Sequence, residues 1–153
     1  MKRLDEKERL LIKSLRENGR LQVNAVAKAY GFPISTMAAV FHRLQRDGIL
    51  KHGAFVNFQA LGYPIRKVAL IKTRRDCRDR MRDYLKQADQ VNTLHEINSG
   101  FDFMIETVFA NNKEGHEFLE RLAQEQVVLE MNVHDVIDTV HQERFLSEDR
   151  HFD

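Results

Sequence analysis

The stretch AKAYGFPISTMAAVFHRLQRDG, residues 27–48, constrains the fold of this chain more than any other part of the sequence. It has the pattern of two amphipathic helices joined by a short break. In a helix-turn-helix unit, a small residue lets the second helix cross closely, a glycine makes the turn, and two later apolar residues fill the angle between the helices. Ala27, Gly31, Met37 and Val40 stand at these offsets. An ordinary helical corner is the alternative interpretation.

Three helices and a following β segment are predicted around this turn. The first helix begins after Asp5, which can cap it together with Glu8, and it ends at Asn18 and Gly19. The second is expected at about Gln22 to Tyr30. The third is expected from an N-cap at Ser35 to a stop at Gly48, with Met37, Val40, Phe41 and Leu44 directed inward. A β segment is expected from Ile49 to Phe58, where it would form the wing of a winged helix-turn-helix.

The charge of the chain is unevenly distributed. Residues 1–53 contain 11 Lys and Arg against 5 Asp and Glu, a net charge of +6. The rest contains 13 against 18, a net charge of −5. A basic module joined to an acidic one predicts that the first binds a polyanion. The alternative is that helical surfaces are simply charged.

Strands and helices alternate in the second part of the chain. Strands are expected at Arg66–Arg74, Val91–Asn98, Phe101–Ala110 and Val133–Gln142, and helices at Asp76–Ala88 and Asn112–Gln126, the latter with Phe118, Leu119, Leu122 and Ala123 inward. The order βαββαβ indicates a ferredoxin-like α+β sandwich. The predicted domains are a helix-turn-helix domain over 1–53, a connector over 54–65 and a ligand-sensing and oligomerisation domain over 66–153.

The first and last predicted strands of this sandwich are apolar on both faces. A strand with one face in water is expected to be polar on that face. We therefore expect a homodimer formed through sheet faces; the alternative is that the N-terminal helices of the same chain cover the sheet.

Several classes of protein are disfavoured by the composition. No apolar run is long enough for a membrane span, and the charged start MKRLDEKERLLIK does not suit a secretory signal, so a cytoplasmic location without membrane association is expected. Cys77 is the single cysteine and cannot form an internal disulfide. The histidines lack short ligand spacing with it, and no nucleotide-binding or nucleophile motif occurs, so neither a metal nor another cofactor is predicted.

The combination of these modules resembles the Lrp/AsnC transcription regulators, also called leucine-responsive or feast/famine regulators. The resemblance rests on Leu4-Asp5, Ile12, Leu15, Asn18-Gly19-Arg20, Ala27, Gly31, Ser35-Thr36-Met37, Arg43-Leu44, Gly48-Ile49, Leu61-Gly62-Tyr63, and Gly100 and Asp102 in "SGFD". It implies a DNA-binding N-terminal domain and a C-terminal effector-sensing domain that dimerises and often assembles into octamers. Effectors of the family are usually amino acids or related small metabolites.

The DNA-binding residues expected on this basis form two groups. Cations near the DNA backbone would be Arg20, Lys28, Arg43, Arg46 and Lys51, and the base-facing edge of the third helix would be Ser35, Thr36, Ala38, Ala39 and His42. Each cation could instead be a solvated surface charge. Family members usually carry arginine where this chain has Val40, and often basic residues at Ala38 and Ala39. We therefore expect weak specificity per half-site, raised by assembly.

The resemblance implies an effector site between subunits, at or near the turn in EINSGFDFMIE, with contributions from the last strand. Ser99 and Gly100 offer backbone N–H groups that can hold a carboxylate, Asp102 would be a counter-charge for an amino group, and Phe101 belongs to the same predicted site. On the last strand, Asn132 and His134 stand where relatives often carry small hydroxyl residues. Asp102 could equally be a turn residue that caps its own backbone.

Two other functions fit the same architecture. Siroheme decarboxylases share the two modules and use histidine and arginine near their site, so His95 and His134 could belong to such an enzyme. The other alternative is a ligand-sensing assembly that has lost DNA binding. The basic N-terminal domain and the ordinary SGFD turn favour a regulator over an enzyme.

Overall fold

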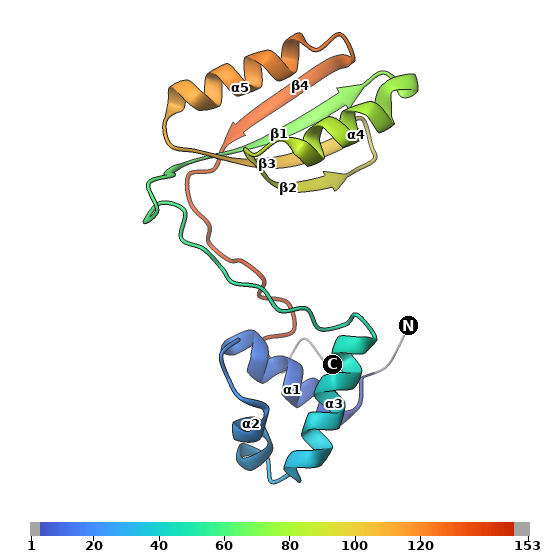
Figure 1. Ribbon diagram of the computed structural model, residues 1–153, viewed down its shortest axis with the longest axis vertical. Coiled ribbons are helices and arrows are strands. Elements are labelled where there is room, and N and C mark those ends of the chain that lie inside the picture. Colours follow the sequence, from blue (N-terminus) through green and yellow to red (C-terminus); the bar gives the residue numbers. More distant parts are fainter. Residues whose placement is uncertain (1–3, 149–153) are drawn as a thin grey trace. The chain divides into compact units, whose positions relative to one another are not determined.

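The computed structural model of the chain describes residues 4–148 and contains two compact units (Figure 1). The first unit comprises the chain up to Phe55 together with the segment that begins at Val140, and the second comprises Val56–Thr139. The predicted domain boundaries stay predictions. They placed all of 66–153 in the second domain and did not anticipate that the last described segment packs with the first unit.

Helix α1 spans Glu6–Glu17 and has the predicted capping box. The side chain of Asp5 accepts a hydrogen bond of 2.8 Å from the backbone N–H of Glu8, and the carboxylate of Glu8 accepts one of 2.9 Å from the N–H of Asp5. At the other end, the N–H of Asn18 donates to the carbonyl of Ser14. Both boundaries of this helix were therefore predicted correctly.

Helices α2, Val23–Ala29, and α3, Ile34–Arg46, form the predicted helix-turn-helix. Ala27 and Met37 are fully buried where the two helices meet. Gly31 has a φ of +72°, a left-handed conformation that glycine adopts without the penalty of a side chain. Ser35 does not cap α3 as expected: Pro33 is the N-cap and Ser35 lies inside the first turn.

The predicted wing is absent from the region between α3 and the first strand. The amides of Ile49 and Leu50 both donate to the carbonyl of Leu44, which closes the end of α3. Beyond them the chain has no regular secondary structure up to residue 57, and turns follow at residues 58–62. A wing strand needs a hydrogen-bonded neighbour, and within residues 4–148 the segment from Ile49 to Phe58 pairs with none.

The second unit is a four-stranded antiparallel sheet with two covering helices (Figure 1). Its elements are β1 (Ile65–Thr73), η1 (Arg75–Cys77), α4 (Arg78–Gln87), β2 (Val91–Glu96), β3 (Phe103–Phe109), α5 (Asn112–Gln124) and β4 (Val128–Asp135). The strand order is β2-β3-β1-β4, so the two central strands are β3 and β1. The predicted fold class, a helix-turn-helix followed by a βαββαβ sandwich, is confirmed.

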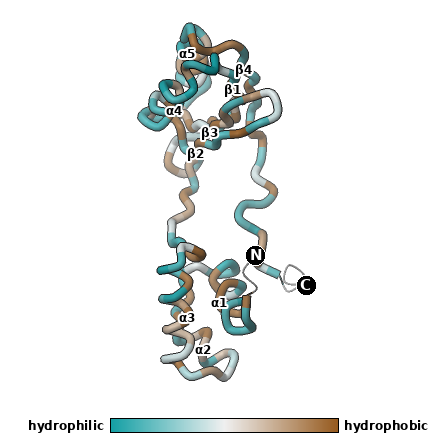
Figure 2. The backbone as a smooth tube through the Cα atoms, turned by 90° about the vertical axis from the view of Figure 1, so that its right-hand side faces the viewer, coloured by the Kyte–Doolittle hydropathy of each residue, from teal (hydrophilic) through white to brown (hydrophobic). Residues whose placement is uncertain are grey.

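The core of this unit lies between the sheet and its helices. Fully buried side chains from the strands include Ile71, Phe103 and Phe109. Figure 2 shows α4 as a mostly hydrophilic helix, and Met81 and Leu85 are its buried residues. These two residues are one helical turn apart and therefore lie on the same side of α4.

Strand β4 begins and ends earlier than predicted. The expected strand was Val133–Gln142, whereas the structure pairs Met131 with Ile71 and Val133 with Ala69. Ile137 and Val140, predicted inside the strand, lie beyond it and are 98% and 78% exposed. The bounds of β4 are determined by its pairing with β1. The spacing of the valines does not reveal that pairing. Ala123 of α5, predicted to face inward, is exposed.

Within residues 4–148, no helix combines the length and the hydrophobicity that crossing a membrane requires.

The capping box of α1 leads to a stability prediction. The backbone N–H of Glu8, followed by the charge of Arg43, holds the pKa of Asp5 below its usual value. The ionised carboxylate therefore stabilises the folded state above its ordinary pKa, and this contribution is lost as the pH falls through the lowered value. We expect Asp5→Ala to reduce the free energy of unfolding by about 1 kcal/mol at neutral pH.

The matched variant is Asp5→Asn, which can still cap the helix but does not titrate. Urea unfolding near neutral pH and in acid should show a smaller loss of stability on acidification for Asp5→Asn than for wild type. Equal stability of all three proteins at neutral pH would contradict the role of this cap.

Candidate DNA-binding face and ligand turn

The outward face of α3 is a ridge of small and polar side chains. Ser35, Ala39, His42 and Arg46 follow one another at helical spacing, and all four are exposed. The opposite face carries the buried Met37, Val40 and Leu44. Packing on α1 and α2 therefore directs the exposed ridge away from the core of the unit. Of the other predicted contact residues, Thr36 and Ala38 lie half-buried beside the ridge.

Four of the five predicted phosphate-contacting cations are exposed. Arg20, Lys28 and Lys51 lie on the surface of the first unit. The side chain of Arg46 is 76% exposed and lies 3.7 Å from the carboxylate of Asp47. These cations can therefore reach a polyanion without first breaking a buried contact.

Arg43 is different because it joins two helices. Its Nη2 donates to Oε1 of Glu8 at 3.0 Å and to Oδ2 of Asp5 at 3.3 Å. The side chain of Glu8 is only 3% exposed, so the guanidinium compensates a nearly buried carboxylate. This arrangement ties α3 to the capped end of α1. Local sequence patterns do not reveal this pair, because its two members are 35 positions apart.

The predicted ligand turn connects β2 to β3. Ser99 and Gly100 at its tip have φ angles of 74° and 110°, and both are exposed. At its base, the N–H of Asp102 donates to the carbonyl of Ile71 at 2.8 Å. The N–H of Ile97 donates to the carbonyl of Asp102 at 2.9 Å. The tip is therefore open, while the base is tied to β1.

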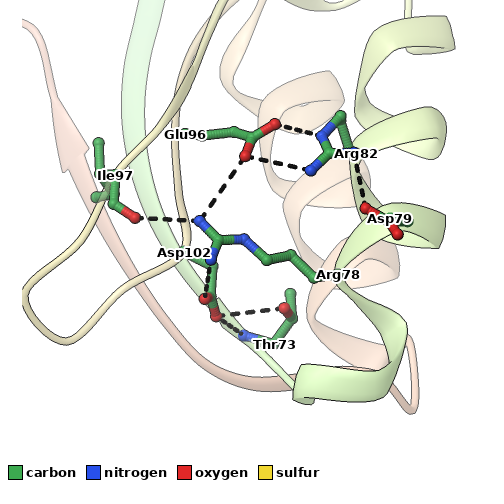
Figure 3. Close-up of polar contacts among 7 residues, drawn as sticks. All are labelled: Thr73, Arg78, Asp79, Arg82, Glu96, Ile97 and Asp102. Carbon is green, nitrogen blue, oxygen red and sulfur yellow. Dashed lines mark hydrogen bonds and ion pairs between the residues drawn. The ribbon is translucent and has the colours of Figure 1, made fainter.

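The carboxylate of Asp102 is already engaged inside the chain (Figure 3). Its Oδ2 accepts hydrogen bonds from the N–H of Thr73 at 2.8 Å and from the hydroxyl of Thr73 at 3.3 Å. Nη1 of Arg78 lies 3.7 Å from Oδ1, and the side chain of Asp102 is 24% exposed. Asp102 thus holds the base of the turn to the end of β1.

Arg78 extends this network from α4 to the neighbouring strand (Figure 3). Its Nη2 donates to the carbonyl of Ile97 at 3.3 Å and lies 3.8 Å from Glu96. The guanidinium also lies over the ring of Phe103, 5.7 Å from its centroid. Sequence reasoning missed Arg78 because its partners come from other elements.

Glu96 connects Arg78 to Arg82, one helical turn later on α4. Arg82 donates two hydrogen bonds to the carboxylate of Glu96, and its Nη1 donates to Asp79 at 2.7 Å. The hydrogen bond from Arg82 lowers the pKa of Glu96 and keeps the carboxylate charged. The helix α4 is thereby fastened to the strand that leads into the turn.

The other predicted effector residues lie away from this turn. Asn132 and His134 are on β4, opposite Leu70 and Val68 of β1. Phe101 is half-buried beside the turn. The single chain therefore brings Ser99, Gly100, Phe101 and Asp102 together but leaves Asn132 and His134 apart from them, on the sheet face that α4 and α5 leave open.

That open face of the sheet has an apolar centre and a polar rim. Val68, Leu70, Met104 and Val108 lie on the two central strands and are half-buried. The strand register places His95 of β2 beside Met104 and His134 of β4 beside Val68, so both histidines are on outer strands. These histidines are therefore separated by β3 and β1 and do not share one site in this chain. Among the described residues, no group of three or more His, Cys, Asp or Glu could hold a metal ion.

Comparison with known proteins identifies the architecture. The chain is 27% identical over 118 residues to the HTH-type transcriptional regulator FL11 of Pyrococcus abyssi, a match that covers 76% of this chain and 78% of the relative. It superposes on AsnC from E. coli with a TM-score of 0.78 at 15% identity, covering 91% of this chain and 95% of AsnC. The fold is that of the Lrp/AsnC transcription regulators.

The resemblance found in the sequence is thereby confirmed. A further solved structure with this Lrp/AsnC fold is the transcriptional regulator NMB0573 from Neisseria meningitidis in its complex with L-Met. It has a TM-score of 0.81 at 17% identity and covers 91% of this chain and 93% of its own. No family model matches the sequence.

The contact between Arg43 and Glu8 leads to a second prediction. Arg43→Ala should lower the free energy of unfolding by about 2 kcal/mol, because it removes a charge-assisted hydrogen bond to a nearly buried carboxylate. Arg46→Ala, a matched loss of a cation on the same helix, should change stability by less than about 0.5 kcal/mol. Urea unfolding measures both. Equal effects would show that Arg43 is a surface cation like its neighbour.

The base of the ligand turn leads to a third prediction. Asp102→Ala should increase the exchange rate of the Thr73 amide and lower the free energy of unfolding by about 2 kcal/mol, because two hydrogen bonds to a carboxylate are lost. Ser99→Ala at the open tip is the control and should leave both quantities unchanged. Hydrogen exchange and urea unfolding provide the measurements. An unchanged Thr73 amide in Asp102→Ala would contradict the assignment.

Proposed function

We propose that this chain is a homo-oligomeric, DNA-binding transcription regulator whose activity is modulated by a small effector. The observation that carries the proposal is the exposed ridge of α3 on a correctly packed helix-turn-helix. The HTH-type regulators among its homologues support this function. In such units the second helix of the motif enters the major groove while the other helices support it.

Phosphate contacts would come from the exposed cations of the first unit. Arg46 follows the ridge at the C-terminal end of α3, and Arg20, Lys28 and Lys51 lie on the surface of the same unit. Arg43 would act differently from the sequence prediction, by holding α3 in position through Glu8 and Asp5. Its loss would then weaken DNA binding through the orientation of the helix.

Base contacts would be few and mostly non-ionic. Ser35, Thr36 and His42 can donate or accept hydrogen bonds, whereas Ala38 and Ala39 offer only methyl groups, which suit the methyl group of thymine. Such a helix gives weak discrimination at one half-site. Specificity would then come from the deformability of the operator and from the simultaneous binding of several half-sites by one assembly.

The open sheet face is the proposed dimer interface. Its central Val68, Leu70, Met104 and Val108 would be buried by a second copy of the same face. Arg66 and Glu106, which pair at 2.7 Å on this face, would add a polar contact. Octamers formed from such dimers are part of the same proposal.

The proposed effector is an amino acid, as in the L-Met complex of NMB0573. The exposed backbone at Ser99 and Gly100 is suited to hold its carboxylate. Asp102 would hold the base of this turn in place, since its carboxylate already accepts a hydrogen bond from Thr73 and pairs with Arg78. The ligand changes DNA binding only when it binds one assembly or domain arrangement better than another.

The alternative of a siroheme-decarboxylase-like enzyme has less support. The histidines that it would use, His95 and His134, lie on opposite outer strands of the sheet. The regulators among the homologues point away from an enzyme. A sensing assembly that no longer binds DNA is the outcome that the following experiment would reveal.

The test measures binding of the full chain to duplex DNA, beginning with its own upstream region, over a range of salt concentrations. We expect Arg46→Ala to weaken binding to all duplexes alike and to reduce the salt slope by about one unit. Lys113→Ala removes an exposed cation of the other unit, 84% exposed on α5, and should leave the slope unchanged. Absence of binding at low salt, or equal slopes for wild type and Arg46→Ala, would contradict the proposal.

A further inference from the structure

The last described segment of the chain is part of the helix-turn-helix unit. Arg16, in the last turn of α1, donates from Nη1 to Oε2 of Glu143 at 2.7 Å and from Nε to the carbonyl of Phe145 at 2.9 Å. Leu146 packs against the apolar core of the same unit. The segment is therefore attached by a polar and by an apolar contact.

The segment has a defined conformation of its own. Glu143 and Leu146 have φ angles of 54° and 65°, in the left-handed region that residues other than glycine rarely adopt. Arg144 lies between them and donates from Nε to Glu148 at 2.9 Å. Two left-handed residues fold the chain so that Glu143 and Leu146 both reach the helical unit. The attachments offset the cost of these conformations.

A second anchor lies just before this segment, in the other unit. Nη1 of Arg66, on β1, donates to the hydroxyl of Thr139 at 2.6 Å. The N–H of Val136 donates to the carbonyl of Arg66 at 2.9 Å. Only the residues numbered 140–142 separate the Thr139 anchor from the Glu143 anchor. A change at the end of β4 is thus connected to α1 through a very short piece of chain.

We propose that residues 140–148 form a clasp on α1 that gives the DNA-binding unit a second connection to the sheet unit, in addition to the connector after α3. The partner of the surface beside Arg16 is this segment of the same chain. It supplies the carboxylate of Glu143, the carbonyl of Phe145 and the apolar side chain of Leu146. The role of the clasp in regulation rests on the proposed function. The contact itself does not.

The consequence is mechanical coupling between β4 and α1. Asn132 and His134, which are proposed to contribute to the effector site, lie on the strand that leads directly into the clasp. Arg16 is on the helix that Arg43 ties to α3 through Glu8. The proposed path from β4 to the DNA-binding ridge runs along the chain through Thr139, Glu143 and α1.

The test reverses the charges of Arg16 and Glu143, singly and together. Amide hydrogen exchange is then measured in the full chain without DNA. The reporter is the Ser147 amide, which donates to the carbonyl of Arg144 at 3.2 Å. Arg16→Glu and Glu143→Arg should each increase its exchange rate several-fold, and the double variant should return it to within about twofold of wild type. Leu146→Ser should increase it on the order of tenfold, because the apolar contact is lost. Glu17→Arg is the matched control, since it makes the same charge change as Glu143→Arg at the position next to Arg16.

The coupling is tested by a substitution in the other unit. Thr139→Val removes the hydrogen bond from Arg66 and should increase exchange of the Ser147 and Asn18 amides several-fold, whereas amides of α4 should not change. Unaltered exchange in the single-charge variants, or a double variant that fails to restore it, would overturn the clasp. Unaltered exchange in Thr139→Val would overturn the coupling. Since no DNA is present, these outcomes are independent of whether the chain binds DNA.

Discussion

The angle between α2 and α3 is the constraint on which the geometry of the helix-turn-helix depends. Ala27 and Met37 are fully buried at the crossing, and the left-handed Gly31 reverses the chain between the helices. A larger side chain at Ala27 would push α3 away from the core, and a residue other than glycine at position 31 would strain the turn. The exposed ridge of α3 exists because these small residues allow the buried face to pack closely.

The same unit uses charge to orient its helices. Glu8 closes the capping box of α1 and also accepts a hydrogen bond from Arg43 of α3, so one nearly buried carboxylate serves two elements. An ion pair of this kind can cost as much in desolvation as it returns in attraction. Its value here is geometric, because it fixes the position of α3 relative to the start of α1. Arg16 at the other end of α1 receives the C-terminal segment.

In the sheet unit, a comparable network separates a rigid base from an open tip. Thr73, Arg78 and Glu96 come from β1, α4 and β2, and they meet at the connection between β2 and β3 (Figure 3). Asp102 is central to this network and is committed to neighbours in its own chain. A turn whose base is fixed can offer its exposed backbone to a ligand without a large loss of entropy on binding.

Local patterns were sufficient to predict most of the elements but not the contacts between them. The capping box at Asp5, the glycine turn at Gly31 and the βαββαβ order are written in short stretches of sequence. The register of β4 depends on pairing with β1, more than 50 residues earlier. The prediction from the spacing of the valines at 133, 136 and 140 therefore placed the strand too late in the chain. The roles of Arg43, Arg78 and Arg16 likewise depend on partners brought close only by the fold.

The central claim is that the exposed ridge of α3 is the surface that meets duplex DNA. The most direct measurement is an NMR titration of the full chain with duplex DNA at low salt, with backbone amide shifts recorded for both units. We expect the largest shift changes at Ser35, Ala39, His42 and Arg46, with the amides of β1 and β3 unaffected. Changes that cluster on the sheet, or no changes in α3 at saturating DNA, would contradict the claim.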